Sequence, residues 1–279
     1  MALKIVTDSL GDISPDIIKE LGITIIPLNI TFGTESYRDG IDLTTEQFYE
    51  KLTHSKVLPK TTLPSLSTFI EVYDKLAEET DEILVITISQ KLSATYEAAL
   101  QSINQKKKRC RIEVIDSQQA IAAEGLLVIA AARAVKNGTS LDQVIELTRH
   151  NIPRLDVRIV FDTLEFLHRG GRIGKAKAFL GSVLKMNPIL GIKDGEVYPF
   201  GRERSRAKAI EYLYNFAASF SHIDEMAVED ATTPDEADML VERLGSIYPK
   251  ERIYRSKVSP VIGAHVGPHV LGVSVLGDK

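Results

Sequence analysis

The chain has 279 residues, of which 44% are hydrophobic and 26% are charged, a composition typical of soluble globular proteins with a full core. The formal net charge of −4 excludes a general electrostatic attraction to nucleic acid or to an anionic membrane surface. The single cysteine, Cys110, excludes an internal disulfide framework and any multi-cysteine metal site. The first residues lack the apolar run of a signal peptide, and the apolar stretch 120–132 is too short to span a bilayer. We therefore expect a cytoplasmic protein with no membrane span.

Strands and helices alternate through the first half of the sequence. The pattern predicts strands at 3–6, 23–32, 83–88 and 112–115, helices at 15–20, 45–52, 66–79, after Ser93, through Val135 and from Ser140 to near Pro153, and a loop at 61–65. Such alternation indicates a mainly parallel sheet with right-handed crossovers. A ligand site is then expected beyond the carboxyl ends of the strands, where the sequence places Thr7-Asp8-Ser9, Ser89 to Ser93 and Asp116-Ser117.

The pattern changes at about residue 157. The second half predicts a strand at 157–163, a helical segment at 164–184, a hairpin around Asp194-Gly195, a helix at 207–220, a strand at 226–229, a helix begun by Thr233-Pro234, and strands near Ile253 and Val273. We place a domain boundary near residues 153–157. The predicted organisation is therefore an N-terminal α/β domain (1–155) and a C-terminal α/β domain with a mixed sheet (156–279).

Residues 81–100 predict a strand, a short polar loop with Ser93, and the start of a helix. Backbone N–H groups and the helix dipole can hold an anion in this geometry, and Ser93 adds a hydroxyl. The alternative is that Ser93 only caps its helix. In the same way, Thr61 either contributes to a polar site or merely starts a turn.

A glycine-rich segment at 262–269 contains His265 and His269. It is interpreted as a loop that brings the His265 imidazole to a polar site, or as a turn with a hydrogen-bonded histidine. The spacing of the two histidines resembles a metal pair, but Pro268 argues against a regular helix, and no nearby Cys or Glu completes a ligand set. We expect no metal.

Two basic clusters remain. Residues 169–175 superficially resemble a phosphate loop, but the glycine spacing is wrong and Ala176 stands where Ser or Thr must hold magnesium. The second cluster is Arg202, Arg204 and Arg206. Both clusters are interpreted either as docking or anion-contact surface or as solvated surface. There is no G-x-S-x-G elbow and no G-x-G-x-x-G after a strand, so neither hydrolase chemistry nor dinucleotide binding has motif support.

Several short motifs occur in a fixed order along nearly the whole chain. They are Thr7-Asp8-Ser9, Lys60 to Ser65, Ile88 to Tyr96, Val114 to Ser117, Leu164 to Ile173, Asn187 to Leu190 with Asp194-Gly195, and His265 to Pro268. This ordered set resembles the DegV family of bacterial proteins. Ala94 departs from the family pattern, in which glycine usually follows the serine.

The resemblance implies a two-domain α/β fold with a long-chain fatty acid buried between the domains and no other cofactor. It implies that the fatty acid carboxylate is bound by Thr61 and Ser93 with His265 close by, and Thr62 and Ser117 are expected to support this head-group site. Some family members are the acyl-carrying subunit of a bacterial fatty acid kinase and present the carboxylate to a separate ATP-binding subunit. The resemblance thus implies a lipid-binding protein and not an enzyme, and we expect the kinase to dock on a surface that includes Arg169, Arg172, Arg202 and Arg204.

Two other functions stay open. The first alternative is a small-molecule hydrolase or phosphoryl-transfer enzyme that uses Ser93 and His265. The second is an interaction module that uses the arginine surface. The first rests only on residue types that can form a nucleophile and a base.

Overall fold

The computed structural model describes residues 3–55, 57–181 and 186–279. Its first half forms a four-stranded sheet in the order β2-β1-β6-β7, in which every pairing is parallel. The strands are β1 (Lys4–Asp8), β2 (Thr24–Ile26), β6 (Glu82–Thr87) and β7 (Arg111–Asp116). Helices α3 (Leu66–Leu76) and α4 (Thr95–Ile103) pack on one face, and α1 (Pro15–Leu21), α5 (Ile121–Lys136) and α6 (Leu141–Asn151) pack on the other. The predicted parallel sheet is confirmed.

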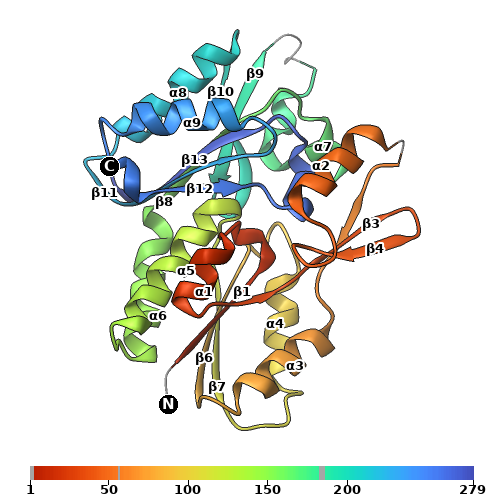
Figure 1. The fold of residues 1–279 in the computed structure, drawn as a ribbon, viewed down its shortest axis with the longest axis vertical. Coiled ribbons are helices and arrows are strands. Elements are labelled where there is room, and N and C mark those ends of the chain that lie inside the picture. The colour runs from red at the N-terminus through yellow and green to blue at the C-terminus, as the bar shows by residue number, and fades with distance from the viewer. Residues whose placement is uncertain (1–2, 56, 182–185) are drawn as a thin grey trace.

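The second half forms a six-stranded mixed sheet in the order β10-β9-β8-β13-β11-β12 (Figure 1). Its strands are β8 (Leu155–Val160), β9 (Asn187–Lys193), β10 (Glu196–Glu203), β11 (His222–Asp230), β12 (Ile253–Lys257) and β13 (Leu271–Asp278), and its outer face is covered by α8 (Arg206–Ala218) and α9 (Pro234–Leu244). The hairpin between β9 and β10 turns at Asp194 and Gly195, whose φ angles are 53° and 77°. Two successive positive φ values are what a two-residue hairpin turn requires, so this prediction is confirmed.

A small third sheet corrects the prediction of one strand at 23–32. Strand β2 ends at Ile26, and a separate strand β3 (Asn29–Phe32) pairs with β4 (Glu35–Arg38) and β5 (Lys60–Thr62). Pro27 lies between β2 and β3, and proline has no N–H with which to continue a ladder. Strand β5 also replaces part of the loop expected at 61–65. Helix α2 (Thr45–His54) begins with the predicted capping box of Thr44 and Gln47.

Two further expectations about helices were wrong. The helical segment expected at 164–184 is only α7 (Glu165–Arg169) followed by a 3-10 turn at 174–179, because Gly171 and Gly174 adopt positive φ values that a regular helix cannot contain. Residues 182–184 of that prediction lie outside the described residues. Conversely, His265 lies on a helix, α10 (Pro260–Val266), and not on a loop. Pro268 does not interrupt this helix, because Gly267 ends it first.

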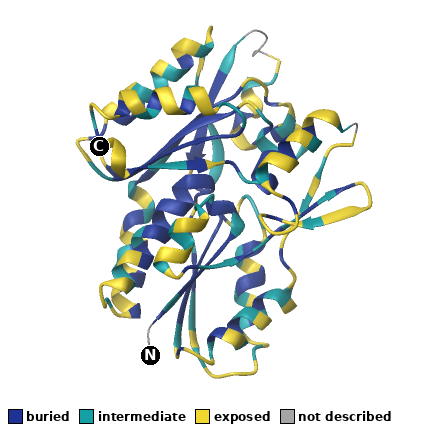
Figure 2. Ribbon diagram, in the orientation of Figure 1, coloured by how far each residue is buried: buried dark blue, intermediate teal, exposed yellow. Residues whose placement is uncertain are grey.

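Helix α5 lies between the two sheets (Figure 1). Its Leu126 and Leu127 belong to one apolar cluster with Ile86 of the four-stranded sheet and Leu276 of the six-stranded sheet. The helix is buried along most of its length, whereas the outer helices expose one face (Figure 2). Both halves of the chain thus share this helix as core. Among the residues described, no helix is both long and apolar enough to cross a membrane.

Candidate functional site

A cavity with about 720 Å³ of empty space, partly open to solvent, is lined by both halves of the chain. Its twenty lining residues include sixteen apolar ones. These are Leu10, Leu28, Ile88, Leu92, Ala120, Ile121, Ile159, Phe161, Leu167, Leu190, Gly191, Ile192, Val197, Val261, Ile262 and Val266. The polar ones are Thr61, Ser93, Arg172 and His265. The cavity is thus apolar along its walls, with four side chains able to bind a polar group.

Thr61 and His265 are in direct contact although 204 residues separate them. The Thr61 Oγ1 lies 2.9 Å from the His265 Nε2, since β5 and α10 pack together. Burial, with a smaller contribution from the Arg172 charge, lowers the pKa of His265 to about 4. The imidazole is therefore neutral at neutral pH, and its buried Nδ1 has no hydrogen-bond partner among the described residues.

Ser93 lines the same cavity from the loop before α4. Its Oγ lies 2.8 Å from the Thr95 Oγ1 and accepts the Thr95 N–H at 3.3 Å, so the hydroxyl also orders the start of the helix. The loop is closed by the Ser93 N–H, which donates to the Ser89 carbonyl at 3.1 Å. Ser89 in turn donates its hydroxyl to the Gly195 carbonyl of the other half at 2.8 Å. The N-cap residue of α4 is Ala94 and not Ser93, so the capping interpretation is wrong in its strict form, whereas the site interpretation is compatible with this geometry.

Arg172 adds a positive charge to the site. It was expected on a docking surface; it is exposed, and it also lines the cavity. Its guanidinium donates to the Gly170 carbonyl at 2.8 Å and to the Leu92 carbonyl at 3.3 Å, which links the turn after α7 to the Ser93 loop. Among the cavity-lining residues it is the only one that is positively charged at neutral pH. The basic turn gave a signal for anion contact, but not for the cavity it faces.

Glycines allow α7 to pack closely against α10. A Cβ atom at Gly170 would lie 2.3 Å from the His265 Nδ1, and one at Gly267 would lie 2.5 Å from the Phe166 ring. Both distances are far below van der Waals contact. Glycine at positions 170 and 267 therefore lets the segment at α7 contact the His265 imidazole and the end of α10 directly.

The structure places the other predicted site residues outside the cavity lining. Thr62 is exposed, since successive side chains on a strand point to opposite faces and Thr61 takes the inner one. Ser117 is fully buried, and its hydroxyl accepts the Gln119 N–H at 3.0 Å at the end of β7.

The other three arginines of the expected docking surface are exposed as well. Arg169 forms an ion pair with Glu165, and Arg202 lies over the Phe179 ring, 5.9 Å from its centroid. Arg204 is exposed at the end of the β10 segment.

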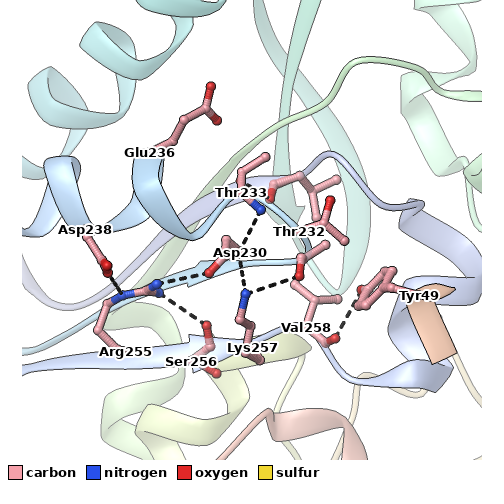
Figure 3. Close-up of polar contacts among 12 residues, drawn as sticks. Tyr49, Asp230, Thr232, Thr233, Glu236, Asp238, Arg255, Ser256, Lys257 and Val258 are labelled. Carbon is pink, nitrogen blue, oxygen red and sulfur yellow. Dashed lines mark hydrogen bonds and ion pairs between the residues drawn. The ribbon is translucent and has the colours of Figure 1, made fainter. Parts of the chain in front are cut away.

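An ionic network around the buried Asp230 fixes the segment that leads into α10 (Figure 3). Asp230, at the end of β11, is fully buried and accepts from the Lys257 Nζ at 2.7 Å, the Thr233 N–H at 2.9 Å and the Arg255 guanidinium at 3.1 Å. The Tyr49 hydroxyl of α2 donates to the Val258 carbonyl at 3.1 Å. This network holds α10, and hence His265, against the first half of the chain.

No motif signalled this network in advance, because its members lie far apart in the sequence, near residues 49, 230 and 257. Within the described ranges, no group of three or more His, Cys, Asp or Glu side chains is arranged to hold a metal ion.

Comparisons with known proteins agree with this architecture. A family model described as an uncharacterised protein of the DegV family matches residues 2–278. A DegV domain-containing protein from Caldanaerobacter subterraneus subsp. tengcongensis is 35% identical over 97% of both chains, and Protein DegV from Bacillus subtilis is 31% identical over 98% of both.

Two solved structures are similar along their whole length. A DegV family protein from Thermus thermophilus, described by its fatty acid binding, superposes with a TM-score of 0.91 at 32% identity, with 99% of this chain and 100% of that chain covered. DegV from Bacillus subtilis, described as a fatty acid binding protein, superposes with a TM-score of 0.89 at 31% identity, with both chains fully covered. The chain belongs to the DegV family.

Proposed function

We propose that this protein binds a long-chain fatty acid in the cavity, with the carboxylate held by Thr61, Ser93 and His265. The observation that supports this most directly is the composition of the cavity wall, which is apolar except for those three residues and Arg172. A ligand that matches such a wall has a long apolar body and one compact polar end.

The apolar wall accounts for the tail. Burial of a methylene group gains about 0.8 kcal/mol, so a chain of about 14 methylenes gains on the order of 11 kcal/mol at that coefficient. Association costs about 4–15 kcal/mol. Tight binding therefore depends on a cavity that is already formed and on good hydrogen bonds to the head group.

The polar residues account for the head group. A buried carboxylate is very costly unless donors surround it, and the hydroxyls of Thr61 and Ser93 are such donors. Arg172 supplies a positive charge at the same cavity, which further offsets the cost of the anion. The Thr61 hydroxyl is hydrogen-bonded to the His265 Nε2. When the imidazole donates its Nε2–H to this oxygen, the hydroxyl hydrogen stays available for the carboxylate.

The geometry favours binding over nucleophilic catalysis. Ser93 bonds to Thr95 and, among the described residues, makes no hydrogen bond to His265. The Nδ1 of His265 has no partner among those residues either, whereas a general base of a triad is oriented by a carboxylate at this position. One relative also supports ligand binding over catalysis: a structure from Eubacterium ventriosum at 25% identity is described as a stearic acid binding protein.

We further propose that the protein presents the bound carboxylate to a separate ATP-binding fatty acid kinase subunit in the cytoplasm. The family resemblance supports this, as do the exposed Arg169, Arg202 and Arg204 on elements adjoining the cavity. Charge reversal of Arg202 and Arg204 is expected to weaken capture of the kinase subunit in a pull-down, with fatty acid binding unchanged. Equal capture would show that these arginines are only solvated surface.

Lipid extraction and native mass spectrometry of the purified protein test the binding proposal. We expect a co-purified long-chain fatty acid, and calorimetric binding of palmitate or oleate to the delipidated protein. Ser93→Ala is expected to weaken this binding while the thermal stability of the unliganded protein changes little. No recovered lipid together with no calorimetric binding would refute the proposal.

A further inference from the structure

One buried carboxylate organises two walls of the cavity. Asp8, at the carboxyl end of β1, is 2% exposed. Its two carboxylate oxygens accept the Leu10 N–H at 3.0 Å and the Ile88 N–H at 2.9 Å. Leu10 and Ile88 both line the cavity, although 78 residues separate them. Asp8 does not line the cavity, but it fixes the backbone of two segments that do.

A second carboxyl group lies beside it on α5. Glu124 is fully buried in the first turn of this helix, three residues after the cavity residue Ile121. Its Oε1 accepts the Thr7 hydroxyl at 3.3 Å, whereas its Oε2 is buried with no hydrogen-bond partner among the described atoms. A carboxylate oxygen in that situation is very costly, but a protonated carboxyl group is not.

The segment after Asp8 is pressed against the same turn of α5. A Cβ atom at Gly125 would lie 2.2 Å from the Gly11 carbonyl oxygen. This close approach and the hydrogen bond from Thr7 to Glu124 hold residues 7–11 against the first turn of α5, where the charge of Asp8 acts on Glu124.

The carboxyl groups of Asp8 and Glu124 differ in how tightly they hold a proton. Within the described chain, no hydrogen bond or ion pair joins either carboxyl group to a lysine, arginine or histidine. Burial raises the pKa of Asp8 to about 6, against the lowering effect of its two backbone N–H bonds. Burial, and then the charge of Asp8, raises the pKa of Glu124 well above its usual range. Of the two groups, Glu124 therefore holds its proton more tightly, and Asp8 is the one that ionises first.

We propose that Asp8 and Glu124 form a buried positioning pair for the acyl cavity, in which the protonated Glu124 donates its hydrogen to the Asp8 carboxylate that holds Leu10 and Ile88. The inference rests on the proposed function, since the cavity it positions is the fatty acid site.

The pair acts on the head group through a short chain of contacts. Ile88 is the residue at which the loop to Ser93 begins, and the Ser93 N–H is bonded to the Ser89 carbonyl at 3.1 Å. A shift of the Ile88 backbone therefore moves the Ser93 hydroxyl. Neither Asp8 nor Glu124 lines the cavity itself, so both are positioning residues and not ligand-binding ones.

Three substitutions of one residue separate a donor role from a packing role. Glu124→Ala removes both the donor and the volume, and palmitate binding is expected to weaken by roughly tenfold or more, as for loss of a hydrogen bond to a charged group. Glu124→Gln restores an N–H donor of the same shape and is expected to recover most of the lost affinity. Glu124→Met restores the volume without a donor and is expected to recover less. Equal rescue by Gln and Met would overturn the proposal.

The pH profile of palmitate binding gives a readout that packing alone does not move. In the wild type, affinity is expected to fall at alkaline pH, when Glu124 loses its proton and two adjacent charges repel. Glu124→Gln is expected to lose this alkaline decline. Asp12, Asp39 and Asp116 also face the pair, so Asp39→Asn serves as the control and is expected to keep the decline.

Identical alkaline profiles for the wild type and Glu124→Gln would refute the inference. Unfolding midpoints of each unliganded variant show that it is folded. Absence of palmitate binding in the wild type would refute the proposed function instead, so the two failures are distinguishable.

Discussion

Gly170 offers a sharp test of the head-group geometry. Its φ of −72° is one that alanine adopts freely, and replacement of glycine by alanine in such a conformation usually stabilises a protein by about 0.4–1 kcal/mol. At this position, however, the new Cβ would lie 2.3 Å from the His265 Nδ1, whereas ordinary contact begins near 3.4 Å. The imidazole of the Gly170→Ala variant must therefore move by about 1 Å.

Such a shift breaks the 2.9 Å contact between His265 and Thr61, because hydrogen bonds weaken steeply beyond about 3.2 Å. Loss of one neutral hydrogen bond and misplacement of a donor to the carboxylate together cost about 2 kcal/mol. This corresponds to roughly a 30-fold loss in palmitate affinity, measured by calorimetry on delipidated protein.

Gly171 is the matched control for this experiment. It has a φ of 72°, and nothing lies within 4 Å of a Cβ atom placed there. Gly171→Ala is therefore expected to lower the unfolding midpoint through backbone strain while palmitate affinity is unchanged. Wild-type affinity in the Gly170→Ala variant would refute the claim that the imidazole position decides binding.

Three other changes have expected outcomes. Thr61→Val removes the hydroxyl and keeps the shape, so palmitate affinity should fall roughly fivefold for a loss of about 1 kcal/mol, with little change in the unfolding midpoint. Asp230→Ala removes the buried carboxylate that Lys257 and Arg255 share, while Arg255 keeps its ion pair with Asp238. Because both cations are partly exposed, the loss should be about 1–3 kcal/mol of stability in chemical denaturation, whereas Asp238→Ala at the exposed end of the same network should cost under 1 kcal/mol. Burial raises the pKa of Asp39 to about 7 and that of Glu229 to about 8. The folded protein therefore holds these protons more tightly than the unfolded chain. The stability that these two groups contribute should be complete below about pH 4 and be lost as the pH rises through 7 and 8, and an unfolding midpoint at pH 9 equal to that at pH 5 would contradict this.

Local signals predicted the elements that local chemistry determines. The capping box at Thr44 and the positive-φ turn at Asp194-Gly195 were readable because the residues that form them are adjacent in sequence. The strand at 23–32 was wrong because β-branched residues on both sides of Pro27 look continuous, while tertiary pairing sends them to different sheets. Helix α10 was missed because Pro268 was taken as a breaker, although it stands beyond the helix end.

In the candidate site, too, local motifs were readable from the sequence and long-range contacts were not. Thr61, Ser93 and His265 were named from their motifs, and the structure brings them to one cavity. Arg172 was recognised as basic, but its direction depends on how α7 packs against α10. The Asp230 network and the Asp8–Glu124 pair join residues that lie far apart in sequence, and no local pattern encodes such contacts.

Helix α5 has a consequence for how the protein can be divided. It supplies core to both sheets, so a cut at the predicted boundary after residue 155 would leave one flank of this helix in water. A fragment of residues 1–155 would then expose an apolar strip of the kind that promotes aggregation. The intact chain should accordingly melt as one cooperative unit, even though its strands belong to separate sheets.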